Sequence, residues 1–217
     1  MPFGFPALLE LAGRRVVVIG VDAVREHRVR QLLESGATDI TLIVEGDVDV
    51  AETPDDRVRV ERRAWRPSDL DGAFLCLAAS RDAGERAELG TAARERGVLV
   101  NVTDDIPQCD FAMPAIVRRG ELVLAIGTGG GSPTLARKLR EELGDRFGPE
   151  WEEILRVLRE VREETIDALP DLADRSRRWR RALDLEEAQK LVAARRPDDL
   201  ADRLRTRLLA DREEVTS

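Results

Sequence analysis

A carboxylate at the end of a short apolar run is the residue of this sequence best placed to move protons. The run covers residues 98–102, and Asp104 follows it inside the segment Asn101-Val-Thr-Asp-Asp-Ile-Pro-Gln-Cys-Asp-Phe-Ala-Met-Pro114. A carboxylate at a strand end can accept a proton from a bound ligand as a general base. Taken alone, an aspartate in this place is more often a helix cap or a turn residue. The motifs around Asp104 therefore have to decide between the two interpretations.

An altered glycine turn follows the first apolar run of the chain. Residues 16–19 end at Gly20, and a helical pattern begins soon after, so the turn has the place of a dinucleotide-binding loop. Such a loop requires small residues in G-x-G-x-x-G/A spacing, because the backbone must approach a pyrophosphate closely. The window reads Gly20-Val-Asp-Ala-Val-Arg25, so only the first glycine is present. Asp22 places a negative charge on the path of the pyrophosphate.

Two interpretations of this turn remain open from the residues alone. Either NAD binds in a shifted pose, with Arg25 or Arg28 offsetting the negative charge, or the nucleotide site is lost and the segment is only scaffold. Glu45 lies 25 residues beyond Gly20, where it can accept a hydrogen bond from a ribose hydroxyl or be an ordinary solvated acid. The candidate cofactor-binding residues are Gly20, Asp22, Ala23, Val24, Glu45, Gly46 and Ser80.

A second glycine-rich turn, Gly127-Thr-Gly-Gly-Gly-Ser-Pro133, leads into a helical pattern with leucines at positions 135, 139 and 143. A helix that starts with proline after such a turn exposes backbone N–H groups and the positive end of its dipole, which receive anions well. Arginines near this turn can bind the anion or pair with surface acids such as Glu141 and Glu142. The candidate substrate-binding residues are Thr128, Gly129, Gly130, Ser132 and Arg137.

The elements that must position these residues alternate between strand and helix up to about residue 110. The continuous apolar run at 16–19 predicts a strand covered on both faces, and 73–79 a central buried strand. Further strands are predicted at 40–44, 58–62 and 98–102. Helical patterns separate these runs, so we expect an α/β fold with a doubly wound parallel sheet of Rossmann type. A hairpin with its turn at Arg119-Gly120 follows. From Pro149 only amphipathic helices are predicted, from apolar residues at helical spacing over 151–161, 185–192 and 200–208, with breaks at Pro170 and Pro197. The expected domains are 1–112, 113–148 and a helical domain over 149–217.

Composition and charge exclude several classes of protein. The formal net charge of −8 disfavours nucleic acid and anionic membranes as partners. A helix needs about 20 apolar residues to span a bilayer, and no apolar run of the sequence approaches this length. The first residues lack the pattern of a signal peptide, so we expect a cytoplasmic protein.

The few cysteines and histidines give no metal-site pattern. Cys76 and Cys109 form no C-x-x-C pair. His27 is the only histidine, so no metal site of several histidines is expected. We expect Cys76 in the core, Cys109 as a free structural thiol and His27 on the surface.

Two long motifs, at 101–114 and 127–140, and the helix end Leu32-Leu-Glu-Ser-Gly-Ala37 resemble one family. They are similar to the amino-terminal module of siroheme synthases and to the precorrin-2 dehydrogenase/sirohydrochlorin ferrochelatase family, over roughly residues 3–148. The resemblance implies an NAD-binding Rossmann domain, a small α+β dimerisation domain and a helical domain, in a homodimer. It also implies oxidation of precorrin-2 to sirohydrochlorin with NAD, and insertion of Fe²⁺, as the substrate metal, to give siroheme.

The resemblance also assigns roles to residues of this chain. Asp104 falls on the key acid of the family, which would take protons from the tetrapyrrole. Thr128 occupies the position of a family serine in the second glycine turn, whose anion-receptive character suits a polycarboxylate tetrapyrrole.

The chain departs from the family pattern on the NAD side. The family loop Gly-Gly-Gly-x-Val-Ala is changed, Ala-Thr-Asp after the central strand is Ala79-Ser80-Arg81, and Arg86 stands at an asparagine position. Asp104 and the second glycine turn keep the pattern. We therefore expect a siroheme-pathway enzyme whose dehydrogenase half is impaired and whose tetrapyrrole half is retained. The alternatives are a working dehydrogenase, a non-catalytic tetrapyrrole-binding or carrier protein on the same fold, and a nucleotide-sensing domain.

Overall fold

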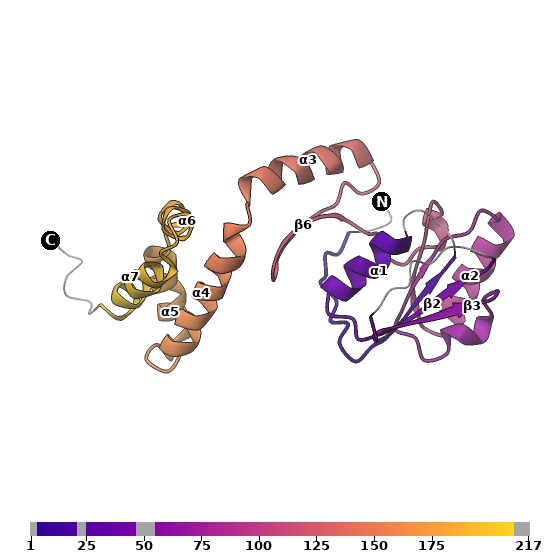
Figure 1. The fold of residues 1–217 in the computed structure, drawn as a ribbon, viewed down its shortest axis with the longest axis horizontal. Coiled ribbons are helices and arrows are strands. Elements are labelled where there is room, and N and C mark those ends of the chain that lie inside the picture. Colours follow the sequence, from indigo (N-terminus) through magenta and orange to yellow (C-terminus); the bar gives the residue numbers. More distant parts are fainter. Residues whose placement is uncertain (1–3, 21–24, 47–54, 211–217) are drawn as a thin grey trace. The chain divides into compact units, whose positions relative to one another are not determined.

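The computed structural model describes residues 4–20, 25–46 and 55–210 (Figure 1). The chain divides into two compact units, residues 1–113 and 114–217. A further boundary near residue 148 stays a prediction. Within the described ranges, no helix has the length and apolar character needed to cross a membrane.

The first unit contains a parallel sheet of five strands, in the order β3-β2-β1-β4-β5. The strands are β1 Arg15–Ile19, β2 Asp39–Val44, β3 Val58–Arg62, β4 Leu75–Ala78 and β5 Leu99–Val102. The chain runs outward from β1 in one direction through β2 and β3, and in the other through β4 and β5. This confirms the doubly wound Rossmann-type sheet, whose ligand crevice is expected where the strand order reverses, at the carboxyl ends of β1 and β4.

Two apolar layers explain the continuous apolar character of the central strands. Val16 and Val18 of β1 face the helix α1 (Arg25–Glu34), whereas Val17 and Ile19 face the helix α2 (Ala83–Glu95). Figure 1 shows α1 and α2 on opposite sides of the sheet. A strand buried on both faces has no polar alternation, which is the pattern that the sequence displays. Cys76 is fully buried in the α2 layer, as expected, and His27 is exposed.

The second unit opens with an antiparallel hairpin of β6 (Ala115–Arg119) and β7 (Leu122–Ile126), followed by α3 (Pro133–Arg146). Arg119 pairs with Leu122, so the hairpin turn consists of Gly120 and Glu121. The predicted turn at Arg119-Gly120 was one residue early. Gly120 has a φ of 56°, and a two-residue hairpin favours glycine at such a position.

Four further helices pack around one apolar core in the second unit. They are α4 Glu150–Thr165, α5 Leu172–Ala182, α6 Leu185–Ala193 and α7 Pro197–Leu209. Buried side chains of this core include Ile154, Leu191 and Leu204. Helices α4, α6 and α7 match the predicted amphipathic segments.

Candidate functional site

The site predicted at the sheet edge is a cleft of about 930 Å³ in the first unit. Gly20, Glu45, Ser80 and Asp104 line it, each one or two residues after the end of a different strand. The structure thus brings together four predicted site residues that are up to 84 positions apart in the sequence. Gly46 follows Glu45 and is exposed. The predicted cofactor-binding residues Asp22, Ala23 and Val24 lie outside the described residues.

Gly20 is held in place by the packing of the sheet itself. Its φ is 104°, and a Cβ atom on it would lie 1.9 Å from the carbonyl oxygen of Ala79, at the end of β4. Its N–H donates to the carbonyl of Ile43 at 3.0 Å. Any side chain here would push the ends of β1 and β4 apart. The remaining glycine is therefore required by the sheet, whether or not a dinucleotide binds beside it.

Most of the positive charge around the cleft is already neutralised. Arg63 donates to both carboxylate oxygens of Asp69, at 2.7 and 2.8 Å, and to Glu61 at 2.5 Å. These hydrogen bonds from Arg63 hold the pKa of Asp69 below its ordinary value. Arg86 pairs with Asp105 at 3.0 Å. Among the described residues, Arg81 is the lining arginine that makes no ion pair.

Four carboxylates line the same cleft, from Glu45, Asp82, Glu85 and Asp104. Glu85 accepts hydrogen bonds from the indole N–H of Trp65, at 2.8 Å, and from the hydroxyl of Ser80. Asp82 caps α2 by accepting from the backbone N–H of Glu85 at 2.7 Å. The sequence predicts that Ser80 contacts the cofactor, but its hydroxyl already donates a hydrogen bond to the Glu85 carboxylate.

These observations test whether a nicotinamide dinucleotide suits the cleft. The place of the cleft and its size suit such a ligand, because nucleotides bind at this switch point of α/β sheets. The charge of the described lining residues disfavours the pyrophosphate, since four of their carboxylates stand against a single arginine that makes no ion pair. The sequence reasoning did not find Trp65, Asp82 or Glu85. The spacing of Asp82 and Glu85, which is typical of a helix start, was the available signal.

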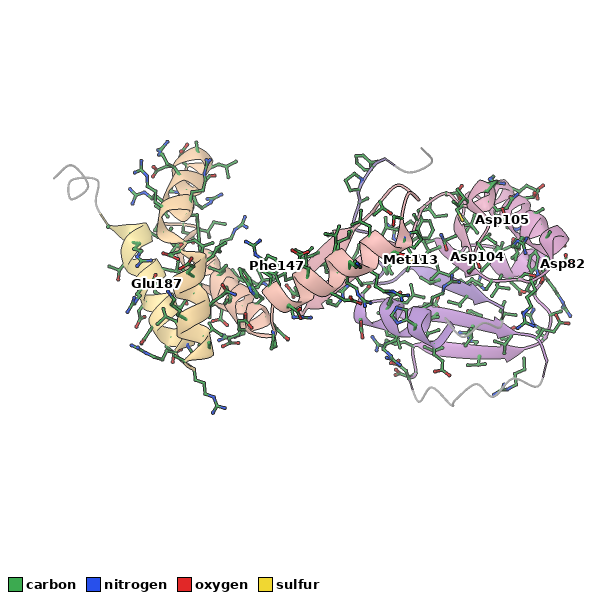
Figure 2. All side chains as sticks on the ribbon, turned by 90° about the horizontal axis from the view of Figure 1, so that it is seen from above. Asp82, Asp104, Asp105, Met113, Phe147 and Glu187 are labelled. Carbon is green, nitrogen blue, oxygen red and sulfur yellow. The ribbon has the colours of Figure 1, made fainter. Side chains whose placement is uncertain are left out.

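Asp104 stands out by its backbone conformation. Its φ is 57°, in the left-handed region, and its side chain is exposed at the cleft. Figure 2 shows Asp104, Asp105 and Asp82 in the same part of the first unit. A non-glycine residue in this region is uncommon and costs on the order of 1 kcal/mol, although aspartate tolerates it better than most residues. Such strain is often found at functional sites, so the conformation agrees with the interpretation of Asp104 as more than a turn residue.

The surroundings of both cysteines disfavour the thiolate form. Burial raises the pKa of Cys76 to about 12, so its thiol stays protonated. Burial also raises the pKa of Cys109, whose sulfur lies 3.1 Å from the carbonyl oxygen of Val102 and so fastens the loop after β5. No group of three or more metal-ligating side chains occurs in the described part of the chain.

The second glycine turn belongs to the second unit and is organised by its own hydrogen bonds. Gly129 and Gly130 have φ values of 59° and 81°. Ser132 caps α3 by accepting from the N–H of Leu135 at 3.1 Å, and the Thr128 hydroxyl donates to the carbonyl of Ser132 at 3.3 Å. Four of the predicted substrate-binding residues therefore share one turn, and the fifth, Arg137, is exposed on α3. Two of the three side chains in this set already have local hydrogen-bond partners.

Comparisons with known proteins agree with this geometry. Residues 7–115 match the model of the family described as "Putative NAD(P)-binding". The siroheme synthase of Methylococcus capsulatus is 30% identical over 89% of this chain and 41% of its own length. Siroheme synthase 1 of Pectobacterium atrosepticum is 31% identical over 96% of this chain and 44% of its own length. The chain thus spans about two fifths of the length of these curated relatives.

A solved structure named "SirC, precorrin-2 dehydrogenase" has a TM-score of 0.61 with this chain at 21% identity. The match covers 93% of this chain and 98% of the other, and it shows that the two share a fold. The siroheme synthase relatives confirm the resemblance that the sequence motifs indicate, and the solved structure confirms the fold that this resemblance implies.

Proposed function

Because this chain belongs to the family described as "Putative NAD(P)-binding", and because its relatives at about 30% identity are siroheme synthases, we propose that it is an enzyme of siroheme biosynthesis. Its substrate would be a polycarboxylate tetrapyrrole, precorrin-2 or sirohydrochlorin. The observation that carries the proposal is the position of Asp104, a carboxylate at the switch-point cleft in a strained backbone conformation.

Asp104 is the proposed catalytic residue because both reactions of the pathway release protons. Oxidation of precorrin-2 to sirohydrochlorin removes one hydride and one proton, and the Asp104 carboxylate would accept the proton. A bound NAD⁺ would accept the hydride, and Gly20, Glu45 and Ser80 are the described residues that would hold it. Insertion of Fe²⁺ into sirohydrochlorin displaces two pyrrole N–H protons, for which a carboxylate is again the acceptor.

We further propose that iron insertion is the stronger of the two activities. The support is the charge of the cleft, where the described lining residues offer one unpaired arginine against four carboxylates. The changed sequence Gly20-Val-Asp-Ala-Val-Arg25 adds an acid at position 22. A dinucleotide pyrophosphate would therefore bind weakly, whereas an entering Fe²⁺ ion is attracted by the same negative charge.

The second glycine turn is proposed to bind substrate carboxylates. Thr128, Gly129, Gly130 and Ser132 would contribute backbone N–H groups and hydroxyls at the start of α3, and Arg137 a cation. A homodimer and a location in the cytoplasm belong to the same proposal.

The test is a pair of anaerobic assays on the purified protein. The first follows oxidation of precorrin-2 with and without NAD⁺, and the second follows Fe²⁺ insertion into sirohydrochlorin. We expect rapid, NAD⁺-independent iron insertion and slow oxidation that needs high NAD⁺ concentrations. Tight NAD⁺ binding with rapid oxidation would overturn the proposed order of the two activities. Sirohydrochlorin binding with no turnover in either assay would identify a tetrapyrrole carrier instead of an enzyme.

A further inference from the structure

A buried arginine, Arg28, contacts the ends of the central strands next to Asp104. Arg28 belongs to α1, yet only 7% of its surface is exposed. Its Nη2 donates to the hydroxyl of Thr103 at 2.5 Å, and its Nη1 lies 3.4 Å from the carbonyl oxygen of Ala78. It makes no ion pair with any residue in the described ranges. Burying a charged side chain lowers stability unless its hydrogen bonds and neighbouring charges compensate, so the contacts of Arg28 with Thr103 and Ala78 stabilise it in this place.

Thr103 connects this arginine to the end of the central strands. Its backbone N–H donates to the carbonyl of Ala78 at 2.9 Å, and its hydroxyl donates to the same oxygen at 3.1 Å. Arg28 therefore completes a small network that joins α1, the end of β4 and the residue immediately before Asp104. The network fixes Thr103 from the α1 side of the sheet.

A second arginine holds the residue immediately after Asp104. Arg86, on α2, donates from Nε to the carboxylate of Asp105 at 3.0 Å and from Nη1 to the carbonyl of Ser80 at 3.1 Å. Both side chains of this pair are mostly buried, with 22% and 20% exposed. The backbone N–H of Asp105 also donates to the carbonyl of Val102 at 3.3 Å, which closes the turn.

We propose that Arg28 and Arg86 are positioning residues that clamp the turn 103–105 from opposite faces of the sheet and so fix the Asp104 carboxylate in the cleft. The inference rests on the proposed role of Asp104 as proton acceptor. It explains why the left-handed conformation at Asp104 persists, because both neighbours of Asp104 are fastened by charge-assisted or buried hydrogen bonds. It also gives the ion pair between Arg86 and Asp105 a function in this chain.

The test compares Arg28→Met, Arg28→Lys, Arg86→Met and Arg86→Lys with Arg30→Met. Arg30 is an exposed residue of α1, two positions after Arg28, and is the matched control. If the clamp sets the position of Asp104, each Met variant lowers kcat on the order of 100-fold with little change in KM, because a displacement of about 1 Å has this effect. The Lys variants recover part of the loss, and Arg30→Met behaves as wild type. In an Asp104→Ala background, the Met substitutions cause no additional loss.

A second measurement needs no substrate and separates this inference from the proposed function. Hydrogen exchange of the Thr103 and Asp105 amides is expected to be faster in the Met variants, while amides of β1 and β2 exchange as in wild type. Thr103→Val, which removes the acceptor hydroxyl at nearly constant size, should reproduce the effect if Arg28→Met does not fold. Unchanged exchange at residues 103–105 would overturn the clamp. Wild-type protein without activity would overturn the proposed function, and the exchange rates would then decide the clamp alone.

Discussion

The two glycine turns of this chain each lead into a helix, but they need glycine for different physical reasons. At Gly20, a Cβ atom would lie 1.9 Å from the carbonyl oxygen of Ala79, so the neighbouring strand excludes any side chain. At Gly130, nothing lies within 4 Å of a Cβ atom, and only the φ of 81° favours glycine. The surviving glycine of a dinucleotide fingerprint can thus reflect sheet packing alone. In this chain the evidence for a functional cleft comes from Asp104 and its surroundings.

The largest expected difference between the turns is in stability. Gly20→Ala should lower the free energy of unfolding by about 3 kcal/mol, since backbone must move to admit the methyl group. Gly130→Ala should cost only about 1 kcal/mol, the strain of a left-handed alanine. Chemical denaturation followed by circular dichroism measures both values. Equal losses for the two variants would contradict the distinction.

A smaller effect is expected at the cap of the second turn. Ser132→Ala should lower the free energy of unfolding by about 1 kcal/mol, because the N–H of Leu135 loses its acceptor. Ser132→Asp keeps the cap and adds a negative charge to the proposed substrate turn. It should retain wild-type stability and raise KM for a polycarboxylate tetrapyrrole. If KM is unchanged in Ser132→Asp, the turn has only a structural role.

Arg195 extends the comparison to a left-handed position that has no glycine. Its φ is 59° at the end of α6, and its N–H donates to the carbonyl of Val192 at 2.9 Å. This is the geometry in which helices usually end on glycine. Arg195→Gly should therefore raise the free energy of unfolding by about 0.5 kcal/mol. Thermal denaturation measures the effect, and Arg196→Gly, at a neighbouring residue with negative φ, is the control. A loss of stability in Arg195→Gly would contradict the strain argument.

The smallest expected difference concerns pH and compares an ion pair at the cleft with one in the second unit. The hydrogen bonds from Arg63 hold the pKa of Asp69 below its ordinary value. This carboxylate therefore stabilises the fold above the ordinary pKa of an aspartate, and the stabilisation is lost as the pH falls through the lowered pKa. Asp69→Asn should therefore cost stability at roughly pH 6 and progressively less toward roughly pH 3. The more exposed pair Glu164–Arg205 should show a weaker trend in Glu164→Gln. Urea titrations across this pH range measure the stability of both variants. A stability loss in Asp69→Asn that does not vary with pH would show that the ion pair with Arg63 is not what stabilises the fold at this position.

Much of the fold was predictable because its signals are local. The buried strands read as continuous apolar runs, and the helices α4, α6 and α7 show apolar residues at helical spacing. Helix α5 was missed because its sequence LADRSRRWRRA is dominated by arginine, although Asp171 at its start caps it by accepting from the N–H of Asp174. A cap signal without an apolar stripe is too weak to predict a helix.

The site was predictable in its positions but not in its charges. Glu45 was predicted from its spacing after Gly20, and Ser80 and Asp104 from the family resemblance. All three lie at one edge of the sheet because parallel strands place their carboxyl ends together. The burial of Arg28 depends on Ala78, at the end of β4, and on Thr103, directly after β5, both of which are distant from Arg28 in sequence. The positive charge of Arg63 is likewise neutralised by a partner from another element, because Asp69 lies in the short 3₁₀ helix η1 (Pro67–Leu70) and Arg63 follows the end of β3. Such tertiary pairings leave no periodic signal in the sequence.

The most direct test of the account is the rate of Fe²⁺ insertion into sirohydrochlorin under anaerobic conditions, for wild type, Asp104→Ala and Asp39→Ala. Asp39 is an exposed acid at the opposite end of β2 and is not expected to take part. We predict that wild type and Asp39→Ala form siroheme at the same rate, whereas Asp104→Ala forms it no faster than the uncatalysed reaction while still binding sirohydrochlorin. Equal rates for Asp104→Ala and wild type would contradict the role proposed for the cleft.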